Sequence, residues 1–489
     1  MVPGSYLILC PKATVEQQAD SLNLLGLVSW PTLNNSEELI TLADSSGRII
    51  HFVNYQDTWY RSNLKKLGGW SLEMIDVNYP CTGAPNWTAS IASTGGTPGI
   101  LNSVATDNPD HSPPVIISTF ALNNRKLQIT FDQALRPTSN AQEKITIEPS
   151  IRVDTFFINS FAKPGLTIEL IDTLVEGVIY QLTATGFADC NENVGFNPGP
   201  KTPVGLPQSP ERADLVINEI LFNPRPLGVR FVELYNPSLK ALNLKNWRFA
   251  RWQSNILTDF TSLTTENLMI YPDEYHVFTE SVEKLRSQYP ASANTTMVQV
   301  SDLPTLGDRR GSIVLVEPTG SIIDELQYHE DMHHPLLIDL NGVSLERASP
   351  YEPTNQIDNW HSAAENSGYA TPGKKNSQSL QTSIISQLTV APKLISPLSG
   401  IFPSYTRISF HLDKPGNTGS IKIFNAQGHI VKTLVNNAVL PVTGSFQWDG
   451  TDDRTMRVPM GYYIVLFQVI ERHGMAWQAL QTVAVAPNY

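Results

Sequence analysis

The chain consists of short apolar runs separated by turn-forming residues. The clearest pair of runs is Leu215–Phe222, which is interrupted by Asn218 and Glu219, and Phe231–Tyr235. Between them, Pro224–Gly228 has the composition of a turn. Short runs rich in β-branched and aromatic residues, bounded by turn residues, are typical of β-strands. The pattern therefore predicts two paired strands within residues 215–235.

The chain carries two copies of one domain. Several motifs recur 273 residues apart, and two more recur 274 residues apart. The same offset aligns Glu38–Phe52 with Gly311–Leu326, and each segment reads as two strands joined by a turn. Similarity at a constant spacing is the signature of a repeated domain. The recurring motifs are Pro31-Thr-Leu33 with Pro304-Thr-Leu306, Ser71-Leu-Glu73 with Ser344-Leu-Glu346, Trp87 with Trp360, Thr97-Pro-Gly99 with Thr371-Pro-Gly373, and Asn102-Ser103 with Asn376-Ser377.

The two copies are unequal in length. Pro3–Tyr6 aligns with Pro272–Tyr275, so about 59 residues at the start of the second copy have no counterpart in the first. We therefore expect residues 1–106 to lack N-terminal strands and residues 211–378 to be complete. Sheets normally avoid exposing unpaired edges, so we expect upstream sequence or a partner chain to supply the missing strands. Closure of residues 1–106 into a full sandwich would contradict this expectation.

Two further segments show strand runs at regular spacing. Residues 112–200 and residues 390–489 each contain about five such runs, which is typical of a β-sandwich. Pro198–Pro210 and Asn376–Ser386 read as linkers, because the first is rich in Pro and Gly and the second is polar. The sequence therefore predicts an all-β protein of four tandem immunoglobulin-like β-sandwiches.

Three resemblances to known modules cover most of the chain. The strand pair with Leu242–Trp247 after it resembles the start of a lamin tail domain, an immunoglobulin-like sandwich of nuclear lamins and many secreted bacterial proteins. Residues 112–200, with Thr130-Phe-Asp132, look like the bacterial immunoglobulin-like modules of large surface proteins. These resemblances imply a scaffold and no reaction. A nuclear lamin itself is not expected, because no heptad rod is present.

The last segment resembles a third kind of module. Its motifs Asn425–Gly428, Trp448–Asp452 and Pro459–Tyr462 are similar to those of the immunoglobulin-like module of flagellar hook-capping proteins. The segment is also similar to the C-terminal sorting domains of the type IX secretion route. Both resemblances imply a secreted or cell-surface protein from a bacterium of the Bacteroidetes type.

The amino-acid composition and net charge limit the classes of partner that the chain is expected to bind. The net charge is −12 and the sequence pI is about 5.3, which disfavours nucleic acid, because binding to phosphates depends on clustered Lys and Arg. Only Lys240–Arg251 is locally basic, and it reads as a half-exposed strand. The longest apolar run, Tyr462–Ile470, is much shorter than a membrane helix requires. Residues Met1–Tyr6 do not resemble a signal peptide, so we expect any export signal to lie upstream.

Three cysteines cannot form a disulfide framework. Cys10 and Cys81 lie in the same N-terminal copy and are a candidate bridge, while the alternative is that both are small buried side chains.

One motif has the form of a zinc site. His329-Glu330-Asp-Met-His333 fits H-E-x-x-H, in which two histidines one helical turn apart bind zinc and the glutamate activates water. That chemistry needs a helix, yet Pro335 follows almost at once and a strand precedes the motif. The alternatives are adventitious metal binding and a plain loop, and we expect the loop.

Acidic turns are candidate calcium sites. Asp449, Asp452 and Asp453 lie in one turn, and Asp339, Asn341 and Gly342 lie in another. Clustered oxygen ligands can bind calcium. Neither turn has the spacing of the twelve-residue calcium loop, and Asp is also common in turns for structural reasons. Calcium bound here would stabilise the fold and take no part in a reaction.

Glu219 and Glu233 on the opening strands could form a carboxylate pair for acid–base chemistry. The alternative, which we favour, is that they are charged residues on the solvent face of the strands. The tryptophans are most simply core or corner residues, although one of them could stack against a sugar.

No catalytic residue or cofactor is therefore expected. The sequence predicts a non-catalytic multidomain protein, secreted or on the cell surface, with a structural, adhesive or protein-binding role through the loops at the sandwich ends. Its partner would be a protein or a cell-surface glycan. Two alternatives stay open: the accessory tail of a larger secreted hydrolase or nuclease, which the upstream reading frame would reveal, and an array of carbohydrate-binding modules, which a glycan array would reveal.

Overall fold

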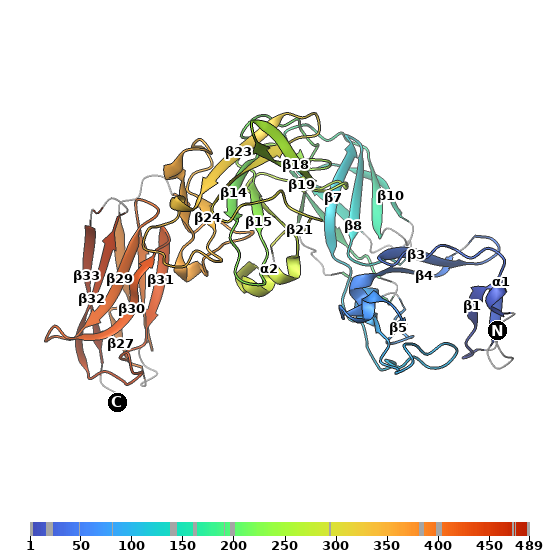
Figure 1. Cartoon of the computed structure of the whole chain (residues 1–489), viewed down its shortest axis with the longest axis horizontal. Helices are drawn as coiled ribbons and strands as arrows, with labels where there is room; N and C mark the ends of the chain where they lie inside the picture. The colour runs from blue at the N-terminus through green and yellow to red at the C-terminus, as the bar shows by residue number, and fades with distance from the viewer. Residues whose placement is uncertain are drawn as a thin grey trace. The chain divides into compact units, whose positions relative to one another are not determined.

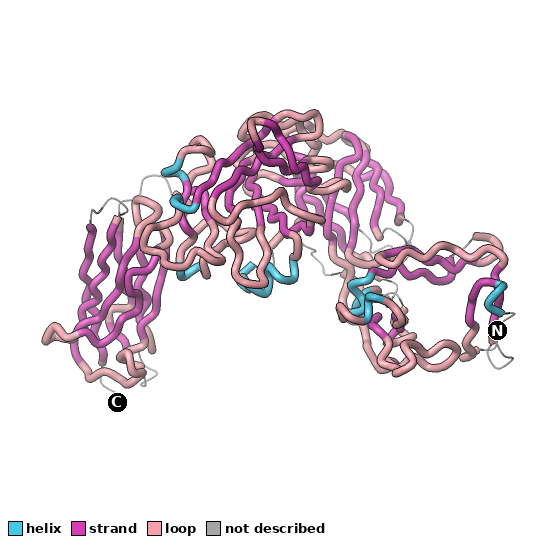
Figure 2. The backbone as a smooth tube through the Cα atoms, viewed as in Figure 1, coloured by secondary structure: helices cyan, strands magenta, loops and turns pink. Residues whose placement is uncertain are grey.

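The computed structural model shows an all-β protein of tandem β-sandwiches, as the sequence predicts (Figures 1 and 2). The chain forms two compact units, Met1–Leu206 and Pro207–Tyr489. None of the helices in the described part of the chain has the length and apolar composition that a membrane crossing requires. The structure describes residues 3–15, 23–47, 49–80, 82–136, 144–159, 164–189, 191–195, 201–292, 295–380, 386–397, 403–471, 474 and 476–486.

The first copy of the repeated domain contains only two-stranded sheets in its described residues. β1 pairs in parallel with β2, while β3 pairs with β4 and β5 pairs with β6 in antiparallel register. The strands described in this copy do not join into a larger sheet. Its elements are β1 (Ile8–Pro11), α1 (Lys12–Val15), β2 (Leu24–Leu27), β3 (Glu37–Ala43), β4 (Ile49–Gln56), η1 (Asp57–Tyr60), η2 (Lys65–Leu67), β5 (Leu72–Met74), η3 (Ala84–Asn86) and β6 (Trp87–Ala89).

The second half of the first unit is a two-sheet sandwich. Its sheets have the orders β10-β11-β8-β7 and β13-β12-β9, and apolar side chains from both sheets form one core. The predicted linker Pro198–Pro210 is wrong in part, because Thr202–Val204 pairs with β12 and Val204 is buried in the core. The strands are β7 (Ile116–Asn123), β8 (Lys126–Phe131), β9 (Lys144–Glu148), β10 (Val153–Ile158), β11 (Gly165–Leu170), β12 (Tyr180–Thr185) and β13 (Thr202–Val204).

The second copy is built on a six-stranded sheet of order β21-β20-β15-β14-β24-β25. It packs against a four-stranded sheet of order β18-β17-β22-β23 around a large core that includes Trp247 and Trp360. The predicted strands 215–222 and 231–235 are confirmed as β14 and β15.

The strands of the second copy are β14 (Val216–Leu221), β15 (Phe231–Tyr235), β16 (Leu242–Asn243), β17 (Arg248–Gln253), β18 (Ile256–Ser262), β19 (Met269–Ile270), β20 (Tyr275–Thr279), β21 (Met297–Gln299), β22 (Arg310–Val316), β23 (Ile322–His329), β24 (Leu345–Arg347) and β25 (Trp360–Ser362). Its helices are α2 (Val282–Gln288), η4 (Pro290–Ser292), η5 (Glu330–Met332), η6 (Ile357–Asn359) and η7 (Glu365–Ser367). The Ser281 side chain caps α2 by accepting a hydrogen bond from the Lys284 amide.

The C-terminal segment is a sandwich of a three-stranded sheet, β26-β28-β31, and a five-stranded sheet, β27-β33-β32-β29-β30. Alternating side chains of β32 enter a core that contains Trp448 and Phe467. Its strands are β26 (Gln387–Ala391), β27 (Leu394–Ile395), β28 (Thr406–His411), β29 (Thr418–Phe424), β30 (Ile430–Val439), β31 (Thr443–Trp448), β32 (Gly461–Ile470) and β33 (Ala476–Val485).

Candidate functional site

Three glutamates lie side by side on adjacent strands of the six-stranded sheet. Glu219 on β14 is paired with Glu233 on β15 and with Glu346 on β24. All three side chains are fully buried. The expectation that Glu219 and Glu233 face solvent is therefore wrong. The reason is that a loop from much later in the chain covers this face of the sheet.

That covering loop, residues 371–378, supplies hydrogen-bond donors to all three carboxylates. The Thr371 amide donates to Glu219 Oε1 at 2.9 Å, and the Thr371 hydroxyl donates to Glu346 Oε1 at 2.7 Å. The Gly373 amide donates to Glu233 Oε2 at 2.5 Å. Gly373 has a φ of +78°, a conformation that glycine adopts without the strain other residues would incur.

The end of the covering loop is also buried in this network. The Ser377 hydroxyl and the Gln378 amide both donate to Glu346 Oε2, at 2.7 and 2.9 Å. Asn376 is buried and donates to the backbone carbonyls of Asn218 and Arg347. The predicted connector Asn376–Ser386 is thus wrong for its first three residues, which belong to the sandwich. Their polarity serves the buried carboxylates.

Burial and mutual repulsion raise the pKa values of this glutamate cluster. Desolvation, followed by the charge of Glu346, raises the pKa of Glu219 to about 8. Desolvation and the charge of Glu219 raise the pKa of Glu233 well above its ordinary value, and desolvation raises the pKa of Glu346. Three neighbouring carboxylates cannot all ionise in a buried site. The cluster therefore joins three strands and the covering loop, with its oxygens engaged in structural hydrogen bonds.

The first copy retains one member of this cluster, Glu73, which corresponds to Glu346. Glu73 accepts hydrogen bonds from the Ser103 amide at 2.7 Å, the Ser103 hydroxyl at 2.6 Å and the Thr97 hydroxyl at 2.7 Å. Burial raises the pKa of Glu73, but the hydrogen bonds from Ser103, Thr97 and Ser90 lower it by more than burial raises it. The pKa of Glu73 therefore lies below its ordinary value.

The H-E-x-x-H motif has no helix of the length that zinc binding requires. β23 ends at His329, and η5 spans only Glu330–Met332 before the chain becomes extended at His333. His329 Nδ1 accepts a hydrogen bond from the Asp331 amide at 3.2 Å, and Glu330 pairs with Arg309. The motif thus forms a short turn.

His333 is directed into the protein core. Its Nδ1 lies 2.9 Å from the Ser362 hydroxyl, and its ring lies 5.5 Å from that of Phe222. Desolvation lowers the pKa of His333 to about 4. His329 thus bonds within the turn, whereas His333 bonds within the core. In the described residues, no group of three His, Cys, Asp or Glu side chains is placed to bind a metal ion.

The acidic turn of the C-terminal sandwich binds its own backbone. Asp449 Oδ1 accepts from the Thr451 amide and hydroxyl, and Asp452 Oδ1 accepts from the amides of Arg454 and Met456. Asp453 Oδ1 accepts from the Thr433 amide at 2.9 Å on neighbouring β30. These are the bonds by which Asp stabilises turns.

The second acidic turn is similar. Asp339 Oδ1 accepts from the Asn341 amide and side chain, at 2.9 and 2.7 Å. Cys10 is a free, buried cysteine in the structure, which fits the alternative of a small buried side chain and not the candidate bridge. Cys81 lies outside the described residues.

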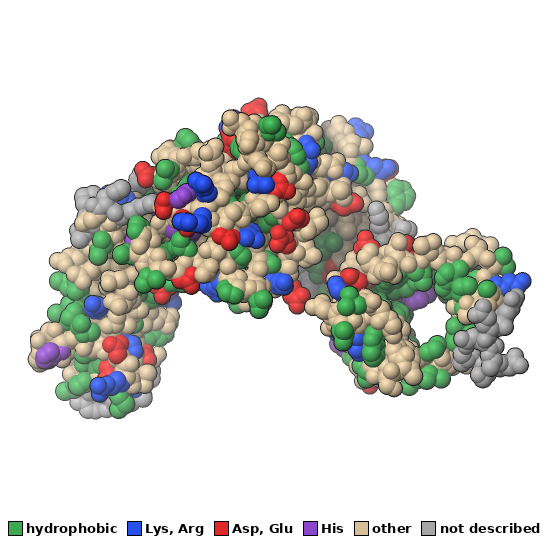
Figure 3. All heavy atoms as spheres, viewed as in Figure 1, with side chains coloured by type: hydrophobic (Ala, Val, Ile, Leu, Met, Phe, Trp, Pro, Cys, Tyr) green, Lys and Arg blue, Asp and Glu red, His purple; other side chains and the backbone are tan. Residues whose placement is uncertain are grey.

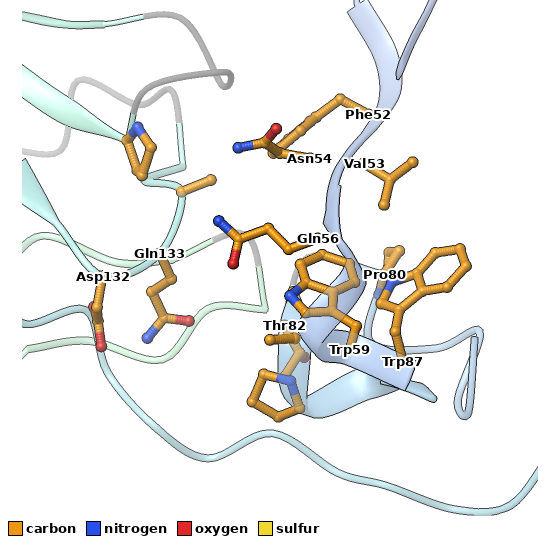
Figure 4. Close-up of a pocket in the computed structure, with 15 residues that line it drawn as sticks. Phe52, Val53, Asn54, Gln56, Trp59, Pro80, Thr82, Trp87, Asp132 and Gln133 are labelled. Atoms are coloured by element: carbon orange, nitrogen blue, oxygen red, sulfur yellow. The ribbon is translucent and has the colours of Figure 1, made fainter. Parts of the chain in front are cut away.

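A cavity of about 310 Å³ in the first unit is lined by two tryptophans (Figure 4). Trp59 and Trp87 are each partly exposed, with ring centroids 6.2 Å apart and planes inclined by 36°. Figure 4 shows their rings beside each other, with Gln56 above and Gln133 and Asp132 across the opening. Adjacent aromatic faces with polar neighbours can bind an amphipathic ligand by stacking and hydrogen bonding.

The sequence patterns did not identify Glu346 and the covering loop as partners of Glu219 and Glu233. A signal was present, because Ser-Leu-Glu, Thr-Pro-Gly and Asn-Ser all recur in both copies. These repeated polar residues are the donors and one acceptor of the buried cluster. Their recurrence indicated a shared structural role.

Parts of this chain are similar to solved structures and to one family model. The N-terminal part of the bacterial S-layer protein SbsC is 14% identical, with coverage of 33% of this chain and 44% of that chain and a TM-score of 0.18. A DUF4876 family protein from Bacteroides thetaiotaomicron is 12% identical, with coverage of 50% and 95% and a TM-score of 0.23. A comparison with curated proteins gives no match. Residues 208–330, which contain β14 to β23, match the family model described as the Lamin Tail Domain.

Proposed function

We propose that this chain is a non-catalytic multidomain protein that acts outside the cell or at the cell surface in a structural, adhesive or protein-binding role. The main support for the proposal is the use of the conspicuous polar groups. Glu219, Glu233 and Glu346 hold strands and a loop together, and His333 bonds Ser362 in the core. Such groups are engaged in stabilising the sandwiches, whose loops and surfaces are free for binding.

The extracellular location is part of the proposal. It is supported by the resemblance of the modules to those of bacterial surface proteins and by their tandem arrangement. Metal-dependent hydrolysis is the competing class. Protein purified without a His-tag or chelator should contain zinc well below one equivalent, and stoichiometric zinc would overturn the proposal.

A second candidate is carbohydrate binding, which the cavity beside Trp59 and Trp87 favours. Measuring the binding of the full chain to a glycan array and to a panel of immobilised surface proteins distinguishes carbohydrate binding from protein binding. If a glycan stacks in the cavity, Trp59→Ala should weaken its binding about tenfold or more, because stacked aromatic rings dominate such sites. Trp30→Ala, at an exposed tryptophan that does not line the cavity, is the matched control. Protein binding that is insensitive to Trp59→Ala supports the first candidate.

A further inference from the structure

Within the described residues of the first copy, no strand joins the counterparts of β20 and β24. In the second copy, β20 pairs with β15 and β24 pairs with β14, which joins the pairs β21-β20 and β24-β25 into one sheet. In the first copy the corresponding pairs, β2-β1 and β5-β6, are separate two-stranded sheets. The position between β1 and β5 therefore corresponds to that of a β-hairpin like β14-β15.

The inner face of the first copy is correspondingly uncovered. Ile40, Leu42 and Ile50 are 40%, 53% and 60% exposed. Their identical counterparts in the second copy, Ile313, Leu315 and Ile323, are 0%, 0% and 2% exposed and belong to the main core. Figure 3 shows hydrophobic side chains on the viewed surface of this part of the chain. Exposed apolar surface of this extent marks an interaction site.

The polar groups that receive β14 are also preserved in the first copy. In the second copy, Ser344 Oγ donates a hydrogen bond to Glu219 Oε1 at 2.5 Å, and the Ser344 amide donates to the Tyr369 carbonyl. In the first copy, the counterpart of Ser344 is Ser71, whose amide donates to the Gly95 carbonyl in the same way. The Asn376 side chain donates to the backbone carbonyls of Asn218 and Arg347. In the first copy, Asn102 corresponds to Asn376 and Met74 to Arg347, and the Asn102 side chain donates to the Met74 carbonyl.

The covering loop itself also has the same form in both copies. Gly99 and Gly373 have φ values of +77° and +78°. The amide of Ile100 bonds the Thr97 carbonyl, as that of Lys374 bonds the Thr371 carbonyl. The first copy thus keeps a site shaped for a strand that carries Asn-Glu.

We propose that this face of residues 3–106 binds a β-hairpin of a partner polypeptide. The first strand of the hairpin has the pattern apolar–apolar–Asn–Glu–apolar–apolar and pairs antiparallel with β5, and its second strand pairs with β1. The glutamate of the hairpin accepts hydrogen bonds from Ser71 and Thr97 beside Glu73, and its apolar residues cover Ile40 and Leu42. Strand addition to an open sheet edge is an established mode of peptide binding. The proposal deepens the protein-binding role proposed above by naming the chemistry of the partner.

The test uses the full chain and a synthetic peptide of residues 214–238, which is the chain's own example of such a hairpin. We expect the peptide to bind once per chain and to slow amide hydrogen exchange in Leu72–Met74 and Ile8–Pro11. Exchange in Leu345–Arg347, where β14 is already in place, should not change. A peptide with Glu219→Val should bind about tenfold or more weakly, because valine cannot accept the hydrogen bonds from Ser71 and Thr97 and leaves these donors unpaired. Leu227→Ser, at an exposed turn position, is the matched control and should bind as the unchanged peptide does.

Several results would overturn the proposal. Absence of binding, or binding that Glu219→Val leaves unchanged, would contradict a built site for this strand. A chain with residues 213–272 fused before Pro3 provides a second arm. Closure of the first copy only in that fusion would contradict a separate partner and assign the strands to the same polypeptide. Each of these outcomes is independent of the glycan and surface-protein assays, so failure here is distinguishable from failure of the proposed function.

Discussion

At the scale of single residues, the second copy combines buried acids and buried histidines with opposite responses to pH. Burial raises the pKa of each of the three clustered glutamates, that of Glu219 to about 8. His333 and His276 are neutral in the core because desolvation lowers the pKa of each to about 4. Both effects follow from burial, and neither was readable from the local sequence.

Glu219→Gln should make the second unit less sensitive to alkaline pH. The folded state holds the Glu219 proton up to about pH 8, whereas an unfolded glutamate releases it near its ordinary pKa of 4.5. The free energy of unfolding therefore falls as pH rises between these values, by up to roughly 1.4 kcal/mol per pH unit for one proton. Glutamine mimics the protonated acid and does not titrate. Urea unfolding between pH 5 and 8 should show a shallower decline for the variant, and parallel profiles would contradict the assignment.

His333→Gln should reduce destabilisation by acid. An unfolded histidine gains a proton near 6.5, whereas folded His333 stays neutral down to about pH 4. Stability from this group is thus lost as pH falls through that range, again by up to roughly 1.4 kcal/mol per unit. Because the glutamate cluster acts in the opposite direction there, the comparison is between variants at each pH, measured by urea unfolding. His329→Gln, four residues earlier in the exposed part of the turn, is the control and should retain the wild-type acid slope.

At the scale of elements, the sequence predicted the strands well where apolar residues alternate or cluster between turns. The pairs β14-β15, β3-β4 and β22-β23 were all predicted, because each has an apolar face and a clear turn. The sequence did not predict β13, because Pro203 within a Pro-rich stretch argues against a strand. β13 lies at the edge of its sheet, where a strand tolerates proline.

The buried glutamates show the main limit of that prediction. Alternation indicates which side chains share a face, but the covering of that face by residues 371–378 depends on contacts between segments about 140 residues or more apart. Charged residues are rarely buried unless they are paired or hydrogen-bonded. The candidate acid–base pair was therefore located correctly on paired strands and given the wrong exposure.

Asp452→Ala should destabilise the C-terminal sandwich irrespective of calcium. It removes an acceptor for two backbone amides, those of Arg454 and Met456, at 2.9 and 2.8 Å. We expect a loss of about 1 to 2 kcal/mol in the free energy of unfolding, as for other turn hydrogen bonds. Thermal unfolding with calcium and with chelator should give the same Tm for the wild type. A calcium-dependent rise in Tm that disappears in the variant would instead establish a calcium site.

At the scale of the whole molecule, the two unequal copies are the feature that organises the chain. One is a closed sandwich with a continuous core, and the other exposes the counterparts of that core. Burying one aliphatic side chain stabilises a fold by about 1.5 to 3 kcal/mol. Ile40, Leu42 and Ile50 together therefore forgo several kcal/mol that a complementing hairpin would recover. We therefore propose that the same domain serves as a finished structural unit in one place and as an open binding surface in the other.

Amide hydrogen exchange of the full chain, read separately for the two copies, is the decisive measurement of this difference. We predict slow exchange in β22 and β24 and much faster exchange in their counterparts β3 and β5, because the first pair lies in closed sheets and the second pair lies at open edges. Equal protection of the corresponding strands in both copies would show that residues 3–106 close on their own, and would rule out an open binding edge in the first copy.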